Sequence, residues 1–489
     1  MSKTLAIPQI IAEINKKMED AGFESYLVGG CVRDLIRGEK PKDWDFTTNA
    51  TPEQIIAIFQ NTFYENTFGT VGVVSETDDE SFKVVEITPY RTEGKYSDYR
   101  RPESVTFAKK IEDDLSRRDL TINAVAYSIS KGQFIDPYKG HSDIKDKIVA
   151  SVGNPEERFS EDALRLMRAV RLATELGFTI NKDTEKALKN NAFLIEKVSR
   201  ERVRDELIKL IMSDNPMFGV QLLYKFGLLK FIIPETEKGV HVKQNGDHIY
   251  DVWEHNIRAL QHSADNKWPL HVRLAALFHD VSKPETRRWS EEKKDWTFYG
   301  HDVVGSRVTK KILERLRFPV KLIDTVSKLV RYHLFFSDVD KITLSAVRRI
   351  VKNVGPENVW DLMKVRACDR IGMGRPKEKP YRLRKYEAMI EEAMRSPVSV
   401  AMLKIDGKRI MEISRETAGP RIGFVLHALL EEVLEDPLKN TSEYLEERAL
   451  SLLKLKDKEL ETLGKAGREK KEKEEEKEVG EIRKRHWVK

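Results

Sequence analysis

The chain has 489 residues, enough for about three domains of ordinary size. Lysine and arginine total 86 against 80 acidic residues, a formal net charge of +6, and the 40% hydrophobic content excludes a wholly disordered chain. No apolar run approaches the ~20 residues that span a bilayer, and the N-terminus lacks the pattern of a secretory signal. We therefore expect a soluble, cytoplasmic protein without a membrane partner, whose mild basicity permits binding to nucleic acid.

The first 150 residues alternate short β-rich runs with helical stretches, which predicts an α+β head with a mixed or antiparallel sheet. The runs TVGVVS and FKVVEIT, joined by the polar segment ETDDE, predict a hairpin. Strands are expected at 26–29, 44–47, 70–75, 82–88 and 120–129.

Helical spacing of apolar residues replaces this pattern after Gly153. One helix is predicted to begin at Ser160, with Asp162 in its first turn, and to end at Gly177. From there to about residue 455 almost the whole pattern is helical. The predicted domains are the head (1–150), a helical neck (151–235), a helical body (236–375), a helical C-terminal region (376–455) and a charged tail (456–489).

The tail from Asp457 onward carries 11 basic and 10 acidic residues and few apolar ones. This composition predicts either a solvated single helix or a disordered segment. The basic ending IRKRHWVK could contact RNA, but a solvated tail is the simpler interpretation.

A glycine pair follows the strand at 26–29 and precedes a predicted helix with Arg33 in its first turn. Gly30 has no side chain and lets a ligand approach the backbone closely, while helix-start N–H groups and a guanidinium favour a phosphate. Taken alone, the pair equally fits a plain tight turn.

Two carboxylates, Asp43 and Asp45, alternate along the next strand and therefore face the same side. A divalent cation relieves their repulsion, and Mg²⁺ suits such a site because it leaves positions for substrate phosphates. With two metal ions an attacking hydroxyl is activated while a triphosphate is held in line. A lone pair of this kind is also common on surface strands.

The segment LVGGCVRDLIRGEKPKDWDFTT resembles the signature of class II tRNA nucleotidyltransferases, the CCA-adding enzymes, and of their bacterial poly(A) polymerase relatives. Four later segments resemble further motifs of that family in order: RRDLTINA, DPYKG, EDALR and RER. The resemblance covers roughly residues 20–215. It implies a nucleotidyltransferase that adds CMP and AMP, taken from CTP and ATP, to the 3′ end of tRNA with release of pyrophosphate.

The resemblance also implies roles for individual residues. Asp43 and Asp45 would hold Mg²⁺ and activate the tRNA hydroxyl, and Asp162 and Arg165 would select the base. On a helix those last two residues would share one face, where a carboxylate accepts from an exocyclic amine and a guanidinium donates to base acceptors; surface ion pairs are the alternative. The remaining nucleotide-binding residues would be Gly30, Arg33, Arg118, Asp119, Asn123, Arg168 and Arg171.

The polar segment RTEGKYSDYRRP, at 91–102, is expected to be a mobile loop. In the family that it resembles, a loop at this place helps to switch the pocket from CTP to ATP. Its full length here favours complete CCA addition over addition of CC alone.

A second group of residues begins with His279-Asp280, at the end of an apolar helical run. Together with His255, His301, His333 and Asp369 these residues resemble, in order and context, the HD phosphohydrolase superfamily. The resemblance implies one or two divalent metals and a bridging water that attacks a phosphoester. Imidazole and carboxylate ligands suit Mn²⁺, Ni²⁺, Fe or Co. Core histidines of a decayed site are the alternative, and His241, His248, His262, His271 and His427 are expected to be structural or surface residues.

Three competing functions remain on sequence grounds. A poly(A) polymerase would share the fold and the motifs, and a partial enzyme would add only CC or only the terminal A. A protein of another class would act mainly as an HD phosphohydrolase, with the head as an RNA-binding module.

Overall fold

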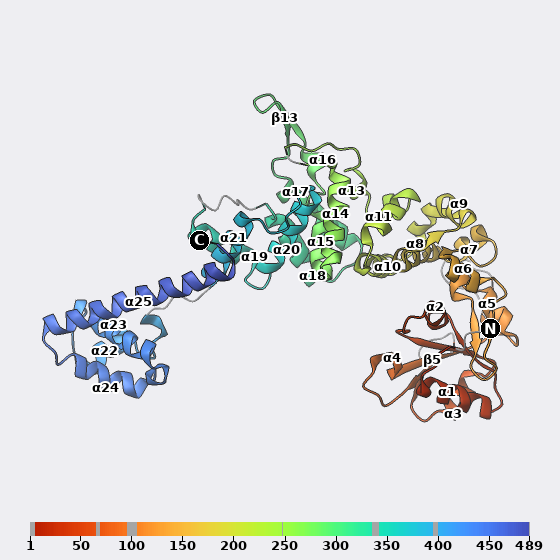
Figure 1. Ribbon diagram of the computed structural model, residues 1–489, viewed down its shortest axis with the longest axis horizontal. Coiled ribbons are helices and arrows are strands. Elements are labelled where there is room, and N and C mark those ends of the chain that lie inside the picture. Colours follow the sequence, from red (N-terminus) through yellow and green to blue (C-terminus); the bar gives the residue numbers. More distant parts are fainter. Residues whose placement is uncertain are drawn as a thin grey trace. The chain divides into compact units, whose positions relative to one another are not determined.

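The computed structural model describes residues 5–64, 69–94, 105–246, 248–334, 342–394 and 400–488. It divides into two compact units, Met1–His333 with Lys364–Pro376, and Leu334–Met363 with Lys377–Lys489. Figure 1 traces the element order along the chain. Most of the predicted loop at 91–102 lies outside the described residues. Within the described residues, no helix combines the length and apolar character needed to cross a membrane.

The head contains a seven-stranded mixed sheet of order β3-β4-β5-β2-β1-β8-β9. Strands β2 and β5 run parallel, and the other neighbours are antiparallel. The expected α+β class with a mixed sheet is confirmed. The strands are β1 (Ser25–Val28), β2 (Trp44–Thr48), β3 (Thr62–Tyr64), β4 (Val71–Val74), β5 (Val84–Pro89), β8 (Ala126–Ser128) and β9 (Gln133–Ile135).

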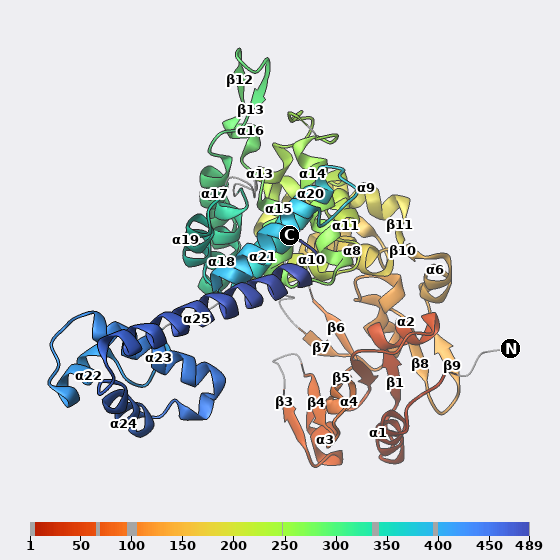
Figure 2. The ribbon, with the colours of Figure 1, turned by 60° about the vertical axis from the view of Figure 1, so that its left-hand side comes forward.

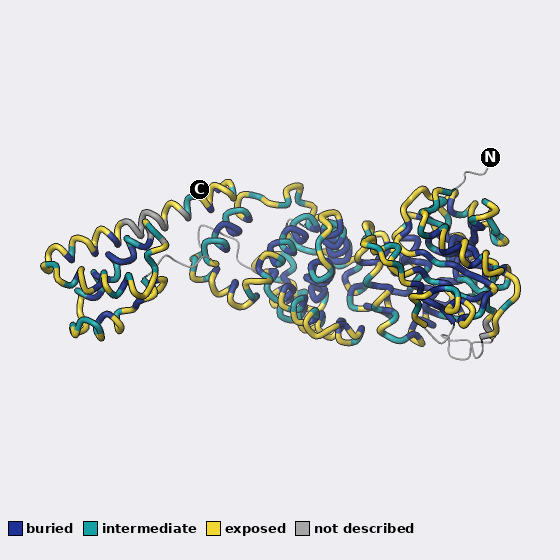
Figure 3. Tube along the Cα trace, turned by 90° about the horizontal axis from the view of Figure 1, so that it is seen from below, coloured by how far each residue is buried: buried dark blue, intermediate teal, exposed yellow. Residues whose placement is uncertain are grey.

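The register of β2 separates the core from the candidate site. Trp44 and Phe46 are each 1% exposed and pack in the main core of the head, together with residues of α1 (Gln9–Asp20). Successive side chains of a strand point to opposite faces, so Asp45 faces away from this core. Figure 3 shows the buried interior of the head in dark blue.

The predicted hairpin at 70–75 and 82–88 is present as β4 and β5, which pair antiparallel. A short helix, α4 (Glu80–Lys83), lies in their connection. The strand predicted at 120–129 is wrong in its first half, where Thr121–Asn123 forms a 3₁₀ turn. The Oγ1 of Thr121 donates to Asp143 instead of lying along a strand, since short polar side chains offer the backbone alternatives to a ladder.

The first helix of the neck was predicted with the wrong start. The structure has two helices here, α7 (Pro155–Glu161) and α8 (Leu164–Leu176). Asn154 caps α7 through the N–H of Glu156, and proline at the first helical position is already suited to helix geometry. Asp162 lies between the helices with extended backbone, φ −130° and ψ 105°.

The neck continues from Gly177, which ends α8 in the left-handed conformation as predicted. A two-stranded parallel pairing of β10 with β11 accompanies its first helices. The following elements are β10 (Ile148–Val149), β11 (Thr179–Ile180), α9 (Lys182–Asn191), α10 (Arg200–Met212), α11 (Pro216–Lys225), α12 (Leu229–Ile232) and α13 (Pro234–Glu237).

The body is helical except for one antiparallel hairpin of β12 (Arg288–Ser290) and β13 (Asp295–Thr297). The expectation of an almost entirely helical region is confirmed, and this short hairpin is the feature that it did not include. Figure 2 shows this hairpin projecting beyond the helices of the first unit. The helices are α14 (Val252–Asp265), α15 (Leu270–Phe278), α16 (Lys283–Thr286), α17 (His301–Arg315), α18 (Val320–Tyr332) and α20 (Val359–Gly372).

The second unit is helical and includes the charged tail as the single helix α25 (Asp457–Arg485). Of the two predicted alternatives, a solvated single helix or a disordered segment, the tail is a single helix. Contrary to expectation, its N-terminal part is not solvated on all sides. Leu460 is fully buried, and a Cβ on Gly464 would lie 2.7 Å from the Cα of Phe424, so α25 crosses α23 at close range. The other helices are α19 (Leu344–Val354), α21 (Tyr381–Met394), α22 (Gly407–Ser414), α23 (Pro420–Glu435) and α24 (Ser442–Leu452).

Candidate functional site

A cavity of about 820 Å³ lies between the sheet of the head and helices α8 and α10 of the neck. Every nucleotide-binding and catalytic residue predicted in the head and neck lines it, except Asp162 and Arg165. The predicted residues in its wall are Gly30, Arg33, Asp43, Asp45, Arg118, Asp119, Asn123, Arg168 and Arg171.

Three functional groups of the cavity wall lie close to Gly29. Its φ of +81° is one that residues other than glycine rarely adopt. Gly29 is also the N-cap residue of the helix α2 (Gly30–Arg37). A Cβ on Gly29 would lie 3.3 Å from Nη1 of Arg118 and 3.5 Å from Oδ2 of Asp45. A helix N-terminus, a guanidinium and a carboxylate therefore meet where the chain has no side chain.

The carboxylates of Asp43 and Asp45 are an oxygen-rich donor set at the start of β2, in the wall of the cavity. Hard cations prefer such oxygens, so the residues present fit a divalent metal ion. Glu86 on β5 is the register partner of Asp45 across the parallel pairing, and sequence reasoning missed it. The signal available was an acidic residue inside the apolar run FKVVEIT.

A chain of polar contacts runs from α2 to the neck. Nη1 of Arg33 donates to Oδ1 of Asn123 at 3.0 Å, and Nδ2 of Asn123 donates to Asp119 at 3.3 Å. Nε of Arg168 then donates to Oδ2 of Asp119 at 2.6 Å. Burial alone would raise the pKa of Asp119, but the guanidinium groups of Arg168 and Arg165 and the hydrogen bonds from Arg168 and Asn123 together lower that pKa. Asp119 is therefore an anion that links the head to α8.

A second buried carboxylate, Asp114 on α5 (Ile111–Ser116), holds the two arginines that follow it. Its oxygens lie 2.7 Å from Nη2 of Arg117 and 3.1 Å from Nη2 of Arg118, and Thr47 on β2 donates to it at 3.4 Å. Burial opposes ionisation, yet Arg118 and Arg117 lower the pKa of Asp114. This residue, absent from the sequence prediction, fixes Arg118 relative to β2.

Replacing Asp114 by asparagine should therefore misplace Arg118. Asp114 is fully buried, and breaking one side of a buried ion pair should lower the free energy of unfolding by about 3 kcal/mol. We expect the KM for the nucleotide to rise about tenfold, equivalent to about 1.4 kcal/mol of binding. Steady-state kinetics and thermal unfolding measure both effects. The exposed neighbour in Glu112→Gln is the control, and an unchanged KM in folded Asp114→Asn protein would contradict the positioning role.

The predicted base-selecting pair does not line the cavity. Asp162 accepts a hydrogen bond from the N–H of Leu164, the first residue of α8, and pairs with Nη2 of Arg202 at 2.7 Å. Arg165 is buried, with Nη1 2.6 Å from Glu161. The two side chains do not share a helix face, because Asp162 precedes α8. The contribution of Arg202 was missed, since it lies 40 residues away in sequence.

Arg171 lines the cavity from α8 and is oriented by two carboxylates. Its Nε lies 2.5 Å from Glu206 of α10, and its Nη1 lies 2.6 Å from Glu175 one turn on. Glu206 is only 4% exposed. The guanidinium is therefore held at a fixed place in the cavity wall.

The histidines and aspartates of the body converge on one buried centre. Their backbones lie on or next to five different helices: α14, α15, α17, α18 and α20. Each residue is at most 5% exposed. The predicted members brought together are His255, His279, Asp280, His301, His333 and Asp369.

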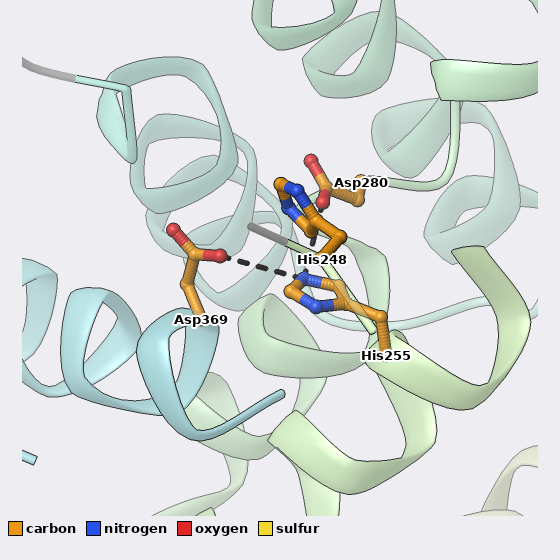
Figure 4. A group of neighbouring side chains, drawn as sticks. All are labelled: His248, His255, Asp280 and Asp369. Carbon is orange, nitrogen blue, oxygen red and sulfur yellow. Dashed lines mark ion pairs between the residues drawn. The ribbon is translucent and has the colours of Figure 1, made fainter. Parts of the chain in front are cut away.

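Asp280 stands between two sets of donor atoms. Its Oδ2 lies 3.1 Å from Nε2 of His255 and 3.3 Å from Nε2 of His279. Its Oδ1 lies 3.1 Å from Nε2 of His301 and 3.5 Å from Nε2 of His333. Figure 4 shows Asp280 and Asp369 approaching the ring of His255. Two metal-binding groups therefore share Asp280, which could contribute an oxygen to each of two ions. The first consists of His248, His255, Asp280 and Asp369, and the second of Asp280, His301 and His333.

The tautomers of three histidines fit metal ligation. The Nδ1 atoms of His279, His301 and His333 lie 2.6–2.8 Å from backbone carbonyl oxygens, which fixes the proton on Nδ1. The Nε2 of His301 then presents a lone pair 3.1 Å from an oxygen of Asp280 that is also an acceptor. Neither His301 nor His333 has a hydrogen-bond partner for Nε2 in the described structure. A cation would satisfy these facing acceptors.

His248 also belongs to this centre, which corrects the expectation that it is a structural or surface residue. One of its ring nitrogens groups with His255, Asp280 and Asp369, as Figure 4 shows. Burial and the ammonium of Lys283 lower the pKa of His248 to about 4, so the ring is neutral. His248 precedes α14, so no helical spacing in the sequence relates it to His255. His241, His262, His271 and His427 join neither metal-binding group in the described residues.

Family models match three segments of the chain. They are the poly(A) polymerase head domain at residues 25–150, the probable RNA and SrmB-binding site of polymerase A at 177–239, and the HD domain at 247–370.

Curated relatives are CCA-adding enzymes. That of Geobacillus stearothermophilus is 31% identical over 431 residues, which cover 88% of this chain and 93% of the relative. Those of Ligilactobacillus salivarius and Limosilactobacillus reuteri are 46% and 45% identical, and the matches cover 47% and 44% of this chain. The chain spans about half the length of these two relatives, 56% and 52%.

Solved structures give the same picture of the fold. The crystal structure of the Bacillus stearothermophilus CCA-adding enzyme in complex with CTP aligns with a TM-score of 0.60 at 28% identity. The alignment covers 92% of this chain and all of that one. A CCA-adding enzyme in complex with ATP aligns with a TM-score of 0.54 at 19% identity, over 92% of this chain and 96% of that one, a likeness of fold alone.

Proposed function

The chain belongs to the family of the CCA-adding enzymes, and on that premise we propose that it is a tRNA nucleotidyltransferase. It adds CMP and AMP from CTP and ATP to the 3′ end of tRNA in the cytoplasm and releases pyrophosphate. The observation that carries the proposal is the meeting of Asp45, Arg118 and the start of α2 around Gly29. The head, neck, body, C-terminal region and tail keep the boundaries proposed above.

Asp43 and Asp45 would hold Mg²⁺, which supplies charge neutralisation for the triphosphate and lowers the pKa of the attacking hydroxyl. The carboxylates themselves orient the 3′ hydroxyl toward the α-phosphate. Arg33 and Arg118 bind the phosphates as charge-assisted donors, aided by the N–H groups at the start of α2. This division of roles is supported by the cavity wall, which both arginines and both carboxylates line.

Arg168 and Arg171 extend the phosphate site from the neck. Arg168 is paired with Asp119 and Arg171 with Glu206, so each guanidinium is placed before the nucleotide arrives. Asp119 and Asn123 would contact the ribose, because their side chains are joined and line the same cavity. Preorganised donors of this kind stabilise the charge that develops during transfer.

Base selection falls to Asp162 and Arg165. Each is engaged by another side chain, Asp162 by Arg202 and Arg165 by Glu161. To bind a base, Asp162 would therefore release Arg202, and Arg165 would release Glu161, in favour of hydrogen bonds to the base edge.

Replacing Asp162 by alanine should lower discrimination against UTP and GTP more than it lowers triphosphate binding. A base-edge contact is worth about 1–3 kcal/mol, or roughly a 5- to 150-fold loss of discrimination. Incorporation rates for the four nucleotides, measured at several concentrations, separate the two effects. Ser160→Ala on the neighbouring helix is the control. An equal loss for all four nucleotides would assign Asp162 a structural role.

The direct test of the function is incubation with tRNA lacking CCA and with CTP alone, ATP alone, or both. Ordered addition of two C residues and one A is the expected result. A ladder of A residues on a generic RNA end would indicate a poly(A) polymerase. A product that stops after CC, or that gains only the final A, would indicate a partial enzyme.

A second function, a metal-dependent phosphohydrolase, is favoured by the buried centre around Asp280. The candidate ligands are His248, His255, His279, Asp280, His301, His333 and Asp369, and Mn²⁺, Ni²⁺, Fe or Co suit that donor set. The ion would supply an activated water. Turnover of terminal or cyclic phosphates without nucleotide incorporation would show that this activity dominates and that the head is an RNA-binding module.

A further inference from the structure

The hairpin β12–β13 carries aromatic side chains that do not enter a core. Trp289 and Trp296 are register partners on one face, with ring centroids 5.4 Å apart. The guanidinium carbon of Arg287 lies 3.6 Å from the centroid of the Trp296 ring. Trp289 nevertheless remains 49% exposed, so the outer indole is open to a further planar group.

A third ring lies beside the base of the hairpin. Tyr299 is 74% exposed, and Nζ of Lys293 lies 5.3 Å from its ring centroid and 2.7 Å from its hydroxyl. The segment 287–299 carries four basic and three acidic residues, and its cations accompany the rings. Rings flanked by cations are the surface that unpaired nucleotides need, because bases stack and phosphates take the charge.

The base of the hairpin adjoins the buried metal-binding residues. Phe298, one residue beyond β13, is buried, and Nζ of Lys283 lies 5.6 Å from its ring centroid. The same ammonium lies 2.6 Å from Oδ2 of Asp280. Asn245, three residues before His248, donates to the carbonyl oxygen of Trp296 at 2.7 Å. The hairpin is therefore fixed to the centre at its base and free at its tip.

The contact between the two indoles of the hairpin also has a structural explanation. A cross-strand aromatic pair stabilises a two-stranded hairpin, which is otherwise marginal in water. That role accounts for contact between Trp289 and Trp296. It does not require Tyr299, which lies outside the paired strands and is mostly exposed.

We propose that this hairpin is a stacking arm for single-stranded RNA. It receives bases on Trp289 and Tyr299 and phosphates beside Arg287, on a hairpin whose base adjoins the centre around Asp280. The inference goes beyond nucleotide transfer, which uses no residue of the hairpin. It adds a second RNA-contacting surface to the first unit.

Photo-crosslinking on the full chain tests the proposal. The probe is an eight-nucleotide RNA of uridines with one 4-thiouridine, and crosslinked peptides are mapped by mass spectrometry. We expect crosslinks within residues 287–299, with a yield at least about fivefold lower in Trp289→Ala and in Tyr299→Ala. Trp289→Phe, which keeps a ring and the strand pairing, should retain most of the yield.

Trp487→Ala removes an indole that is 80% exposed elsewhere and should change nothing. CMP incorporation by the same preparations should stay within about twofold, so failure of the arm and failure of the transferase are distinguishable. Absence of crosslinks at 287–299, or equal yields in all variants, would overturn the proposal. Binding of anionic phosphatidylserine vesicles that depends on Trp289, without crosslinks, would overturn it in favour of a lipid surface.

Discussion

Asp45→Ala is expected to lower the incorporation of both CMP and AMP at least about a hundredfold, while the protein stays folded. The carboxylate lines the cavity, so its loss would remove one of the proposed oxygen ligands and leave the triphosphate less neutralised. The fold should survive because the neighbours Trp44 and Phe46, not Asp45, fill the core. Incorporation of labelled CTP and ATP into tRNA, with thermal unfolding, gives both quantities.

Glu39→Ala provides the matched control, since Glu39 is an exposed acidic residue outside the wall of this cavity. It should leave incorporation unchanged. Near-normal incorporation by folded Asp45→Ala protein would refute the metal assignment. Loss of only one nucleotide's incorporation would instead point to a role in base selection.

Changing His279 and Asp280 together to alanine is expected to abolish transition-metal binding by the body. Asp280 belongs to both metal-binding groups, so both lose a ligand in one variant. CCA addition should remain within a few-fold, because the two sites share no proposed ligand and distant sites usually behave additively. Metal content by mass spectrometry, incorporation, and circular dichroism should be measured on one preparation.

His262→Ala is the control for the double variant, since His262 lies on α14 outside both metal-binding groups. Any phosphohydrolase activity should disappear with the metal. Unchanged hydrolysis would mean that these residues are not its source. Loss of CCA addition in a folded double variant would refute the independence of the two sites.

Sequence patterns were enough to predict those residues of the cavity wall that are close to one another along the chain. The alternation of Asp43 and Asp45 and the glycine pair before α2 are local signals, and the structure brings them together at one cavity. The partners that hold the site could not be predicted, because they come from afar. Asp114 reaches Thr47 across 67 residues, and Glu206 reaches Arg171 across 35.

Two local features were missed for other reasons. The hairpin of β12 and β13 has strands of three residues each, too short for an alternating pattern to stand out. His248 precedes α14 in a loop, where no periodicity relates it to His255.

The position of Asp162 was predicted wrongly because helical spacing placed it inside a helix that begins at Ser160. In the structure the helix begins earlier, after the cap Asn154, and ends at Glu161, so Asp162 lies beyond its end.

The ion pair between Arg168 and Asp119 has a consequence for the salt dependence of nucleotide binding. A phosphate that binds Arg168 as proposed would meet a guanidinium whose charge is already partly balanced by Asp119, with Nε 2.6 Å from Oδ2. Dissolved ions then screen less attraction at this arginine than at an unpaired one. Nucleotide affinity should consequently vary less with ionic strength than the number of arginines in the cavity wall would suggest.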